Sequence, residues 1–297
     1  MDSLHAGDTV AIVSPSVMLS PRRRLDLHNG IAYLESLGLK VKTYPTTFNG
    51  LRLNSSSAQD KARDIMQAYL DPEVKALFAA HGGAASLRVL PFLDFAQIKA
   101  HPKPLIGFSD SSSIQMGIYS QTGLPYVSGF LCEYDFRSGS IDNLVAADLN
   151  RVINGQKFAV EEGVCLREGL AEGILLGGNL SILSDLTGTH YYPDLTDKIL
   201  LVEDESEKPY KISLMLTQLR LNPAFSKVKA VVFGRFSDCD YADSTFGTVD
   251  DVIADFAAQI TVPVLKDFNY GHFPSRHVLP LGVPYKLDTG QCRLEQI

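Results

Sequence analysis

The chain has 297 residues and a mass of 32.5 kDa, enough for one large domain or for two of about 150 residues each. With 45% hydrophobic and 21% charged residues, its composition is that of a folded globular protein and excludes collagen, coiled coil and disorder. The formal charge of −7 and the pI near 5.5 oppose the attraction to phosphates on which non-specific nucleic-acid binding depends. A polynucleotide is therefore not expected as a partner.

The first half of the chain alternates short apolar runs with segments of helical periodicity. Strands are predicted at residues 8–14, 39–45, 75–83, 103–110 and 125–130, and helices between them at 21–38, 57–70, 85–93 and 111–123. Strands that alternate with helices of this length form right-handed crossovers and build a parallel sheet covered on both faces. The sequence therefore predicts an α/β domain over residues 1–150.

The second half follows a stretch between about 131 and 170 in which periodicity weakens and Gly, Ser and charged residues gather. Residues 151–170 are predicted as a linker region. Beyond them, strands are predicted at 171–179, 198–203, 227–234 and 261–268, and helices at 179–188, 209–221 and 248–259. This pattern predicts a second α/β domain over residues 171–297.

The cysteines and the apolar runs indicate a cytoplasmic protein. Cys132, Cys165, Cys239 and Cys292 lie at least 33 residues apart, so they form neither a CxxC pair nor a short disulfide framework. The first residues lack the basic and apolar regions of a signal peptide, and no apolar run approaches the roughly 18 residues of a membrane span. We therefore expect a reducing compartment and no membrane partner.

Ser109 lies where an apolar strand meets a helix. Open parallel sheets bind ligands at the carboxyl ends of their strands, and the run GFSD has the strand, turn and helix context of a nucleophile elbow. The backbone N–H of Asp110, at the helix N-terminus, would stabilise negative charge. The alternative is that Ser109 or Asp110 only caps the helix, and this segment alone favours the cap because the second Gly of G-x-S-x-G is missing.

Two further segments follow strands. The pair Gly82 and Gly83 lets the backbone approach a ligand and aim N–H groups at an oxyanion, or else only permits a tight turn. Glu203 and the pair Gly271-His272 each follow an apolar run, and the order Ser, Glu, His is compatible with a triad. Taken singly, such a His is more often an ordinary surface or core group, and the four carboxylates between 203 and 207 are more often a solvated turn.

Together these segments resemble the LD-carboxypeptidase family of serine peptidases, which includes muramoyl-tetrapeptide carboxypeptidases and microcin C self-immunity peptidases. The resemblance covers nearly the whole chain, through the segments GDTVAIVSPS, HGGAASLRVLPFLD, GFSD, AEGILLGGNLSIL, ILLVEDESEKPYKISLMLTQL, VFGRF and GHFPSRHVLPLG. It implies Ser109 as nucleophile, Glu203 as acid and His272 as base. It also implies a doubly wound, flavodoxin- or amidotransferase-like N-terminal sheet domain, a C-terminal α/β domain, a triad at their junction, and a homodimer.

The implied reaction is hydrolysis of the amide between an L-configured centre and a terminal D-amino acid. The N–H groups of Gly83 and Asp110 would hold the oxyanion, and neither metal nor cofactor is required because the chain has no HExxH, G-x-G-x-x-G or phosphate-loop motif. The resemblance implies release of D-alanine from murein tetrapeptides in cell-wall recycling. The alternatives are a microcin-type peptidase acting on an aminoacyl-nucleotide toxin, which would need an aromatic platform in a chain without Trp, and a non-catalytic binder of small molecules.

The glycine loop departs from the family pattern RGGYG, because this chain has His81-Gly82-Gly83-Ala84-Ala85. The departure bears on substrate orientation, since a carboxypeptidase must recognise the terminal carboxylate with a cation or several donors. The candidate partners are His81, Arg88, Asn179, Arg235 and Arg276. We favour Asn179 together with one nearby cation. Whether the third peptide residue is diaminopimelate or lysine is left open.

Overall fold

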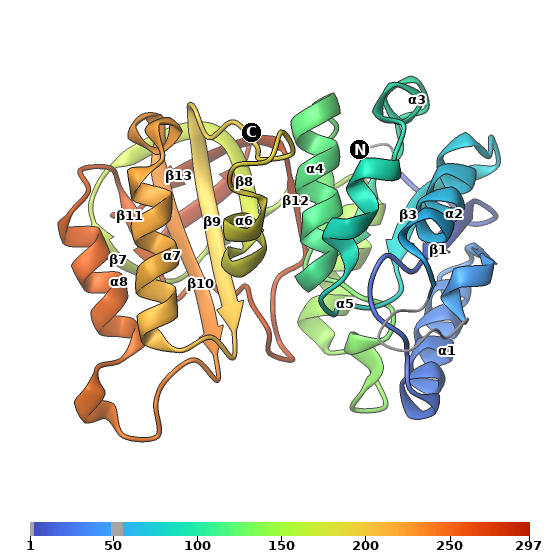
Figure 1. The fold of residues 1–297 in the computed structure, drawn as a ribbon, viewed down its shortest axis with the longest axis horizontal. Coiled ribbons are helices and arrows are strands. Elements are labelled where there is room, and N and C mark those ends of the chain that lie inside the picture. Colours follow the sequence, from blue (N-terminus) through green and yellow to red (C-terminus); the bar gives the residue numbers. More distant parts are fainter. Residues whose placement is uncertain (1–2, 49–55) are drawn as a thin grey trace. The chain divides into compact units, whose positions relative to one another are not determined.

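The computed structural model describes residues 3–48 and 56–297, which form two compact units (Figure 1). The first unit holds the described residues up to Gln156 together with Gly188–Pro193 and Val278–Pro280. The second unit holds Lys157–Thr187, Asp194–His277 and Leu281–Ile297. Each unit has its own sheet, so the predicted α/β class is confirmed. No helix in these described ranges combines the length and hydropathy that a membrane crossing requires.

The sheet of the first unit runs in the order β12-β5-β4-β3-β1-β2. Its strands are β1 (Thr9–Val13), β2 (Lys40–Thr43), β3 (Val74–Ala79), β4 (Leu105–Gly107), β5 (Tyr126–Ser128) and β12 (Leu279–Leu281). The pairs β1 to β2, β1 to β3, β3 to β4 and β4 to β5 are parallel, as the crossovers predict. Their carboxyl ends therefore meet at one edge, where the loops after β1, β3 and β4 lie together.

The helices of this unit begin at polar caps. They are α1 (Pro21–Ser36), α2 (Ala58–Leu70), α3 (Phe95–Ala100), α4 (Ser112–Thr122) and α5 (Asn143–Ile153). The side chains of Ser20, Ser57, Asp94 and Asp142 accept N–H groups of the first turns of α1, α2, α3 and α5. The helix predicted over 85–93 is a 3₁₀ helix, Ser86–Phe92, because Pro91 has no N–H for an α-helical bond and its ring clashes with the preceding turn.

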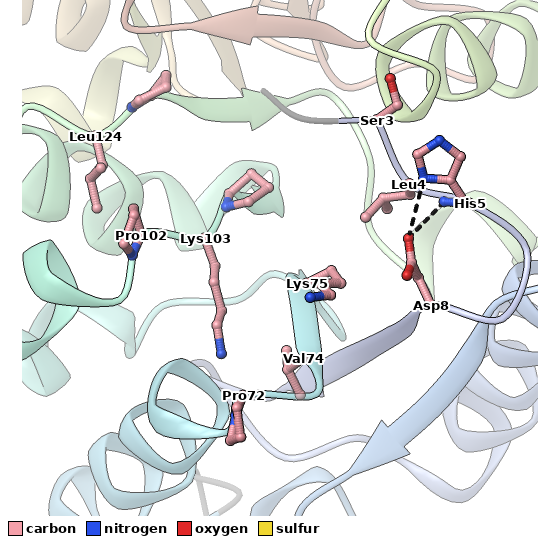
Figure 2. A pocket seen from close by; sticks show the side chains of 12 residues that line it. Ser3, Leu4, His5, Asp8, Pro72, Val74, Lys75, Pro102, Lys103 and Leu124 are labelled. Carbon is pink, nitrogen blue, oxygen red and sulfur yellow. Dashed lines mark hydrogen bonds and ion pairs between the residues drawn. The ribbon is translucent and has the colours of Figure 1, made fainter.

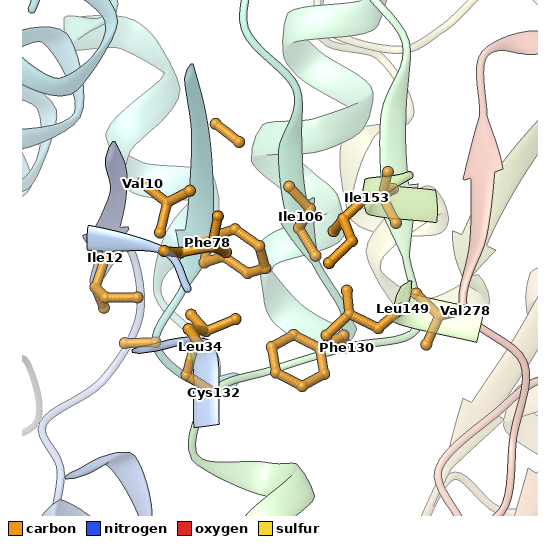
Figure 3. Packing of buried hydrophobic residues seen from close by; sticks show 14 of the residues in the cluster. Val10, Ile12, Leu34, Phe78, Ile106, Phe130, Cys132, Leu149, Ile153 and Val278 are labelled. Atoms are coloured by element: carbon orange, nitrogen blue, oxygen red, sulfur yellow. The ribbon is translucent and has the colours of Figure 1, made fainter. Parts of the chain in front are cut away.

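A cluster of buried apolar side chains holds the first unit together (Figure 3). Phe78 of β3 and Phe130, which follows β5, pack edge to face with ring centroids 6.0 Å apart. Leu34 of α1 and Leu149 of α5 join the same cluster, so both helices are fixed to the strands. Because such cores are close-packed, the strand ends are rigid supports for the loops that follow them.

The sheet of the second unit runs in the order β6-β14-β13-β8-β9-β10-β11-β7. Its strands are β6 (Ala159–Glu161), β7 (Val164–Arg167), β8 (Leu170–Asn179), β9 (Lys198–Glu205), β10 (Ala230–Ser237), β11 (Val264–Lys266), β13 (Val283–Asp288) and β14 (Arg293–Gln296). The central strands β8 to β11 are parallel, and the outer ones pair antiparallel. Helices α6 (Leu180–Leu186), α7 (Pro209–Leu221) and α8 (Val249–Ala258) form where the sequence predicts them.

The stretch of weak periodicity contains regular structure. Helix α5 lies within 131–170, and the residues expected as a linker, 151–170, hold the end of α5 and the strands β6 and β7. These two strands are short, lie at the sheet edges and alternate only between exposed and half-buried positions. They therefore lack the apolar run that identifies a buried strand in a sequence.

Candidate active site

Ser109 adopts a strained backbone conformation at the carboxyl end of β4. Its φ is +61°, in the left-handed region that residues other than glycine rarely occupy. The chain turns there through a 3₁₀ turn, Ser109–Ser111, directly into α4. Ser111 closes this turn, because its Oγ accepts the Phe108 N–H at 2.8 Å and donates to the Phe108 carbonyl at 2.8 Å. Neither Ser109 nor Asp110 caps α4, so the capping alternative is wrong.

The glycine loop lies directly against Ser109. A Cβ placed on Gly82 would lie 3.0 Å from both Cβ and Oγ of Ser109, closer than side chains normally pack. Gly83 has a φ of +152°, and a Cβ there would lie 2.4 Å from Oγ of Ser16. Within residues 3–48 and 56–297 the backbone N–H groups of Gly83 and Asp110 make no hydrogen bond, so both can still donate to an oxyanion.

The carboxylate of Asp110 joins the loops that follow β1, β3 and β4. It is buried, and it accepts the N–H groups of Ala85 and Ser86 at 3.0 Å each, the Ser86 hydroxyl at 2.6 Å, and the Ser16 hydroxyl. The carbonyl of Ser16 in turn accepts the ammonium of Lys61, a buried residue of α2. Burial lowers the pKa of Lys61 to about 8, against the opposing charge of Asp110. The sequence indicated Asp110 for its backbone N–H or as a helix cap, and it did not predict this role of the side chain.

In the second unit, His272 and Glu203 form a buried pair. Nδ1 of His272 lies 2.7 Å from Oε2 of Glu203, whose side chain is fully buried at the carboxyl-terminal part of β9. A carboxylate only accepts, so Nδ1 carries the proton and Nε2 is left as the basic nitrogen. Burial lowers the pKa of His272, but the charge and hydrogen bond of Glu203 outweigh it, and the net pKa is raised.

Gly234 of β10 and Gly271 let this pair approach its neighbours. A Cβ on Gly234 would lie 2.2 Å from the carbonyl oxygen of Tyr270 and 3.1 Å from Cβ of Glu203. Gly271 has a φ of +148°, and a Cβ there would lie 2.7 Å from the carbonyl oxygen of Arg235. The loop that carries His272 can therefore rest on β10 only because both positions are glycine.

Asn179 positions Glu203. It ends β8 and caps α6, where its Oδ1 accepts the Ile182 N–H at 3.1 Å. Its Nδ2 donates to Oε1 of Glu203 and to Oδ1 of Asp204, both at 3.2 Å. The amide is thus engaged within the protein, which weighs against Asn179 as a free donor to a substrate carboxylate.

Asp204 is a second buried carboxylate that we did not single out. It accepts the N–H and the hydroxyl of Ser181 at 2.9 and 2.7 Å, and the N–H of Glu205 at 2.9 Å. Burial raises the pKa of Asp204 to about 6, although the hydrogen bonds from Ser181 oppose this effect and the charge of Glu203 adds to it. Its position next to Glu203 in the sequence was the available signal.

The remaining candidates for the terminal carboxylate differ in exposure. His81 is fully buried with Nδ1 2.8 Å from the Gly82 carbonyl oxygen, and burial lowers its pKa to about 4, so it is neutral at pH 7 and supplies no cation. Arg276 is fully buried, and it donates to the Phe273 carbonyl at 3.0 Å. Arg88 is exposed, and Arg235 is half exposed with its Nη1 3.8 Å from Asp267. Only these last two present an accessible guanidinium.

The first unit also has a cavity of about 580 Å³ (Figure 2). It is lined by residues that precede the strands, among them Asp8 before β1, Lys103 before β4 and Pro125 before β5. In Figure 2, Asp8 accepts the backbone N–H of His5 at 2.7 Å. This cavity is therefore at the amino ends of the strands, opposite to the edge where Ser109 and the glycine loop meet.

Two family models and several known proteins match most of the chain. The model of the LD-carboxypeptidase N-terminal domain matches residues 10–129, and that of the C-terminal domain matches residues 172–287. A putative carboxypeptidase of Synechocystis is 32% identical over 96% of this chain and 93% of its own length. The microcin C7 self-immunity protein MccF of Escherichia coli is 26% identical over 96% of this chain and 92% of its own length. The crystal structure of a muramoyltetrapeptide carboxypeptidase from Oxalobacter formigenes is 28% identical, covers 97% of both chains and has a TM-score of 0.88.

Proposed function

Because the chain belongs to the LD-carboxypeptidase family, we propose that it is a serine carboxypeptidase that hydrolyses the amide between an L-configured centre and a terminal D-amino acid. The observation that carries the proposal is the conformation of Ser109. Its φ is +61° in a turn from strand to helix, next to a loop of two glycines. Strain of this kind costs about 1–3 kcal/mol and persists at functional sites. Five other non-glycine residues of the described chain also have a positive φ, so the support lies in the position of this conformation, at the carboxyl end of β4 and against the glycine loop.

In the proposed first half-reaction, Oγ of Ser109 attacks the carbonyl carbon of the scissile amide. Nε2 of His272 takes the hydroxyl proton, and Glu203, which accepts from Nδ1, stabilises the imidazolium that forms. The N–H groups of Gly83 and Asp110 stabilise the oxyanion of the tetrahedral intermediate. The imidazolium then gives its proton to the amide nitrogen, the C–N bond breaks, and the D-amino acid leaves as a free amine.

The second half-reaction returns the enzyme to its starting state. Nε2 of His272 takes a proton from water, and the resulting hydroxide attacks the ester carbonyl of the acyl-enzyme. The imidazolium returns this proton to Oγ of Ser109 as the ester bond breaks, and the shortened peptide leaves with a new carboxylate. Every proton is thus conserved, and the side chains named here suffice for both steps.

We further propose that the substrate is a murein tetrapeptide that loses its terminal D-alanine, as in the recycling of cell-wall peptides in the cytoplasm. The similarity to a muramoyltetrapeptide carboxypeptidase supports the substrate, and the four free cysteines support a reducing compartment. A homodimer belongs to the same proposal, and light scattering of the purified protein measures it.

The test is incubation with a murein tetrapeptide while free D-alanine is followed. The wild type should release D-alanine, Ser109→Ala should release at least about 10⁴-fold less, and the control Ser120→Ala near the end of α4 should match the wild type. Ordinary activity in Ser109→Ala would refute the nucleophile.

Two other outcomes assign a different function. Turnover of an aminoacyl-nucleotide but not of the tetrapeptide would favour the microcin-immunity type, and binding without turnover of either compound would favour a non-catalytic binder. A tetrapeptide with an amidated terminal carboxylate should be cleaved much more slowly than the acid. Equal rates would replace the carboxypeptidase with a broader amidase.

A further inference from the structure

The imidazole of His272 lies between two carboxylates. Glu203 contacts Nδ1 at 2.7 Å, and an oxygen of Glu205 lies 3.7 Å from Nε2, the nitrogen that exchanges protons in the proposed reaction. A serine triad requires only the first of these carboxylates, which orients the ring. The second one therefore needs its own explanation.

Strand geometry places both glutamates on the same side of the sheet. Residues two apart on a strand point to the same face, and Glu203 and Glu205 of β9 accordingly both reach the imidazole of His272. Glu205 stands in register with Ser237 of β10, and its N–H donates to Asp204 at 2.9 Å. Its backbone is therefore fixed, although its side chain is 41% exposed.

We propose that Glu205 is a positioning residue for the general base: its carboxylate stabilises the protonated ring of His272 from the Nε2 side and sets the pH range in which the enzyme works. This inference rests on the proposed function. At 3.7 Å the contact is an ion pair and not a hydrogen bond, so Glu205 favours the imidazolium without holding the proton that must pass to the leaving amine.

The groups around His272 act in opposite directions. Burial and the charge of Arg276 favour the neutral ring, whereas Glu203 and Glu205 favour the charged ring and together prevail. When Glu205 loses its charge, Glu203 alone must oppose burial and Arg276. The ring of His272 should then lose its proton at a lower pH.

The variant Glu205→Gln tests this directly, because it keeps the shape of the side chain and removes only the charge. NMR titration of labelled histidine should show the His272 midpoint fall by roughly half to one pH unit, the size expected for one partly screened charge at this distance. The acid limb of kcat/KM should move to lower pH by the same amount. The control is Glu207→Gln, which removes an equal charge two residues further along and should move neither midpoint.

The two readouts separate the inference from the proposed function. An unchanged His272 titration in Glu205→Gln, with wild-type activity, overturns the role of Glu205 and leaves the peptidase standing. If the NMR midpoint of His272 shifts in Glu205→Gln but the acid limb of kcat/KM does not, His272 is not the base, and the inference falls with it. The wild-type protein offers a third test. Raising the salt concentration from about 0.05 to 0.5 M should lower the titration midpoint of His272, because salt screens the exposed Glu205 more than the buried Glu203. A midpoint that does not respond to salt contradicts the inference.

Discussion

Replacing Gly82 with alanine should displace the nucleophile while leaving the fold intact. The φ of Gly82 lies outside the left-handed region, so alanine can adopt the same backbone. The added Cβ would lie 3.0 Å from Cβ and Oγ of Ser109, whereas its distance to Leu131, 3.5 Å, is an ordinary contact. Because this contact is tighter than side chains normally make, Ser109 must move by a few tenths of an ångström.

The expected loss of activity follows from that displacement. A misplacement of about 1 Å at a reacting atom can cost about 10²-fold in rate, so a shift of a few tenths of an ångström in Gly82→Ala should lower kcat/KM by roughly 3- to 10-fold. The effect on the free energy of unfolding is smaller. Overpacking costs about 1–3 kcal/mol, and alanine offsets about 0.4–1 kcal/mol of this because it lowers the conformational entropy of the unfolded chain. The net loss should therefore stay near 2 kcal/mol or below.

The assay is release of D-alanine from a tetrapeptide, combined with a thermal unfolding curve and the rate of Ser109 labelling by a fluorophosphonate. Gly290→Ala is the control, since its Cβ would meet only Oδ1 of Asp288 at 3.5 Å. A folded Gly82→Ala protein with undiminished activity and labelling would show that the glycine loop does not bear on Ser109.

The remaining predictions concern the proposed triad and its supports. The double variant Ser109→Ala/His272→Ala should be hardly less active than either single variant, because a triad acts as a unit; additive losses would mean separate roles. Since the pKa of His272 is raised, kcat/KM should rise with pH across a midpoint above the ordinary 6.5, and a flat profile between about pH 5 and 8 would remove His272 as the base. The same raised pKa means that protonated His272 contributes stability below about pH 6.5 that is lost as the pH rises through the folded-state value, which unfolding curves at several pH values will measure. Asp110→Asn should destabilise the first unit by about 2–4 kcal/mol, because a neutral amide oxygen would replace the carboxylate oxygen Oδ2 that accepts all four donors, and an unchanged denaturation midpoint would contradict this. EDTA should leave the rate unchanged, because no proposed step uses a metal, and activity that returns only with zinc would refute the serine mechanism.

The local pattern of the chain determined most of the elements and the family. Apolar runs and helical periodicity depend only on neighbouring residues, which is why β1, α1, α2 and the parallel order of the first strands were predicted correctly. The run GFSD between a strand and a helix identified the strained turn at Ser109, and the motif order identified the LD-carboxypeptidase family. The exceptions are β6 and β7, short edge strands that bury too little apolar surface to leave a pattern, and the strands β12, β13 and β14 near the end of the chain, which were not predicted.

Only the tertiary structure decided what surrounds each charged group. Asp110 binds residues 16, 85 and 86 in the first unit, and Glu203 binds residues 179 and 272 in the second. Within each unit these partners lie far apart in the sequence and meet because the parallel strands of that unit's sheet have their carboxyl ends at one edge. The neutral state of His81 and the burial of Arg276 were also decided by the tertiary structure. Desolvation depends on what packs around a side chain and not on its neighbours in the sequence. The residue types that carry the proposed chemistry were therefore readable from the sequence, but their ionisation and their supports depend on distances that only the folded chain creates.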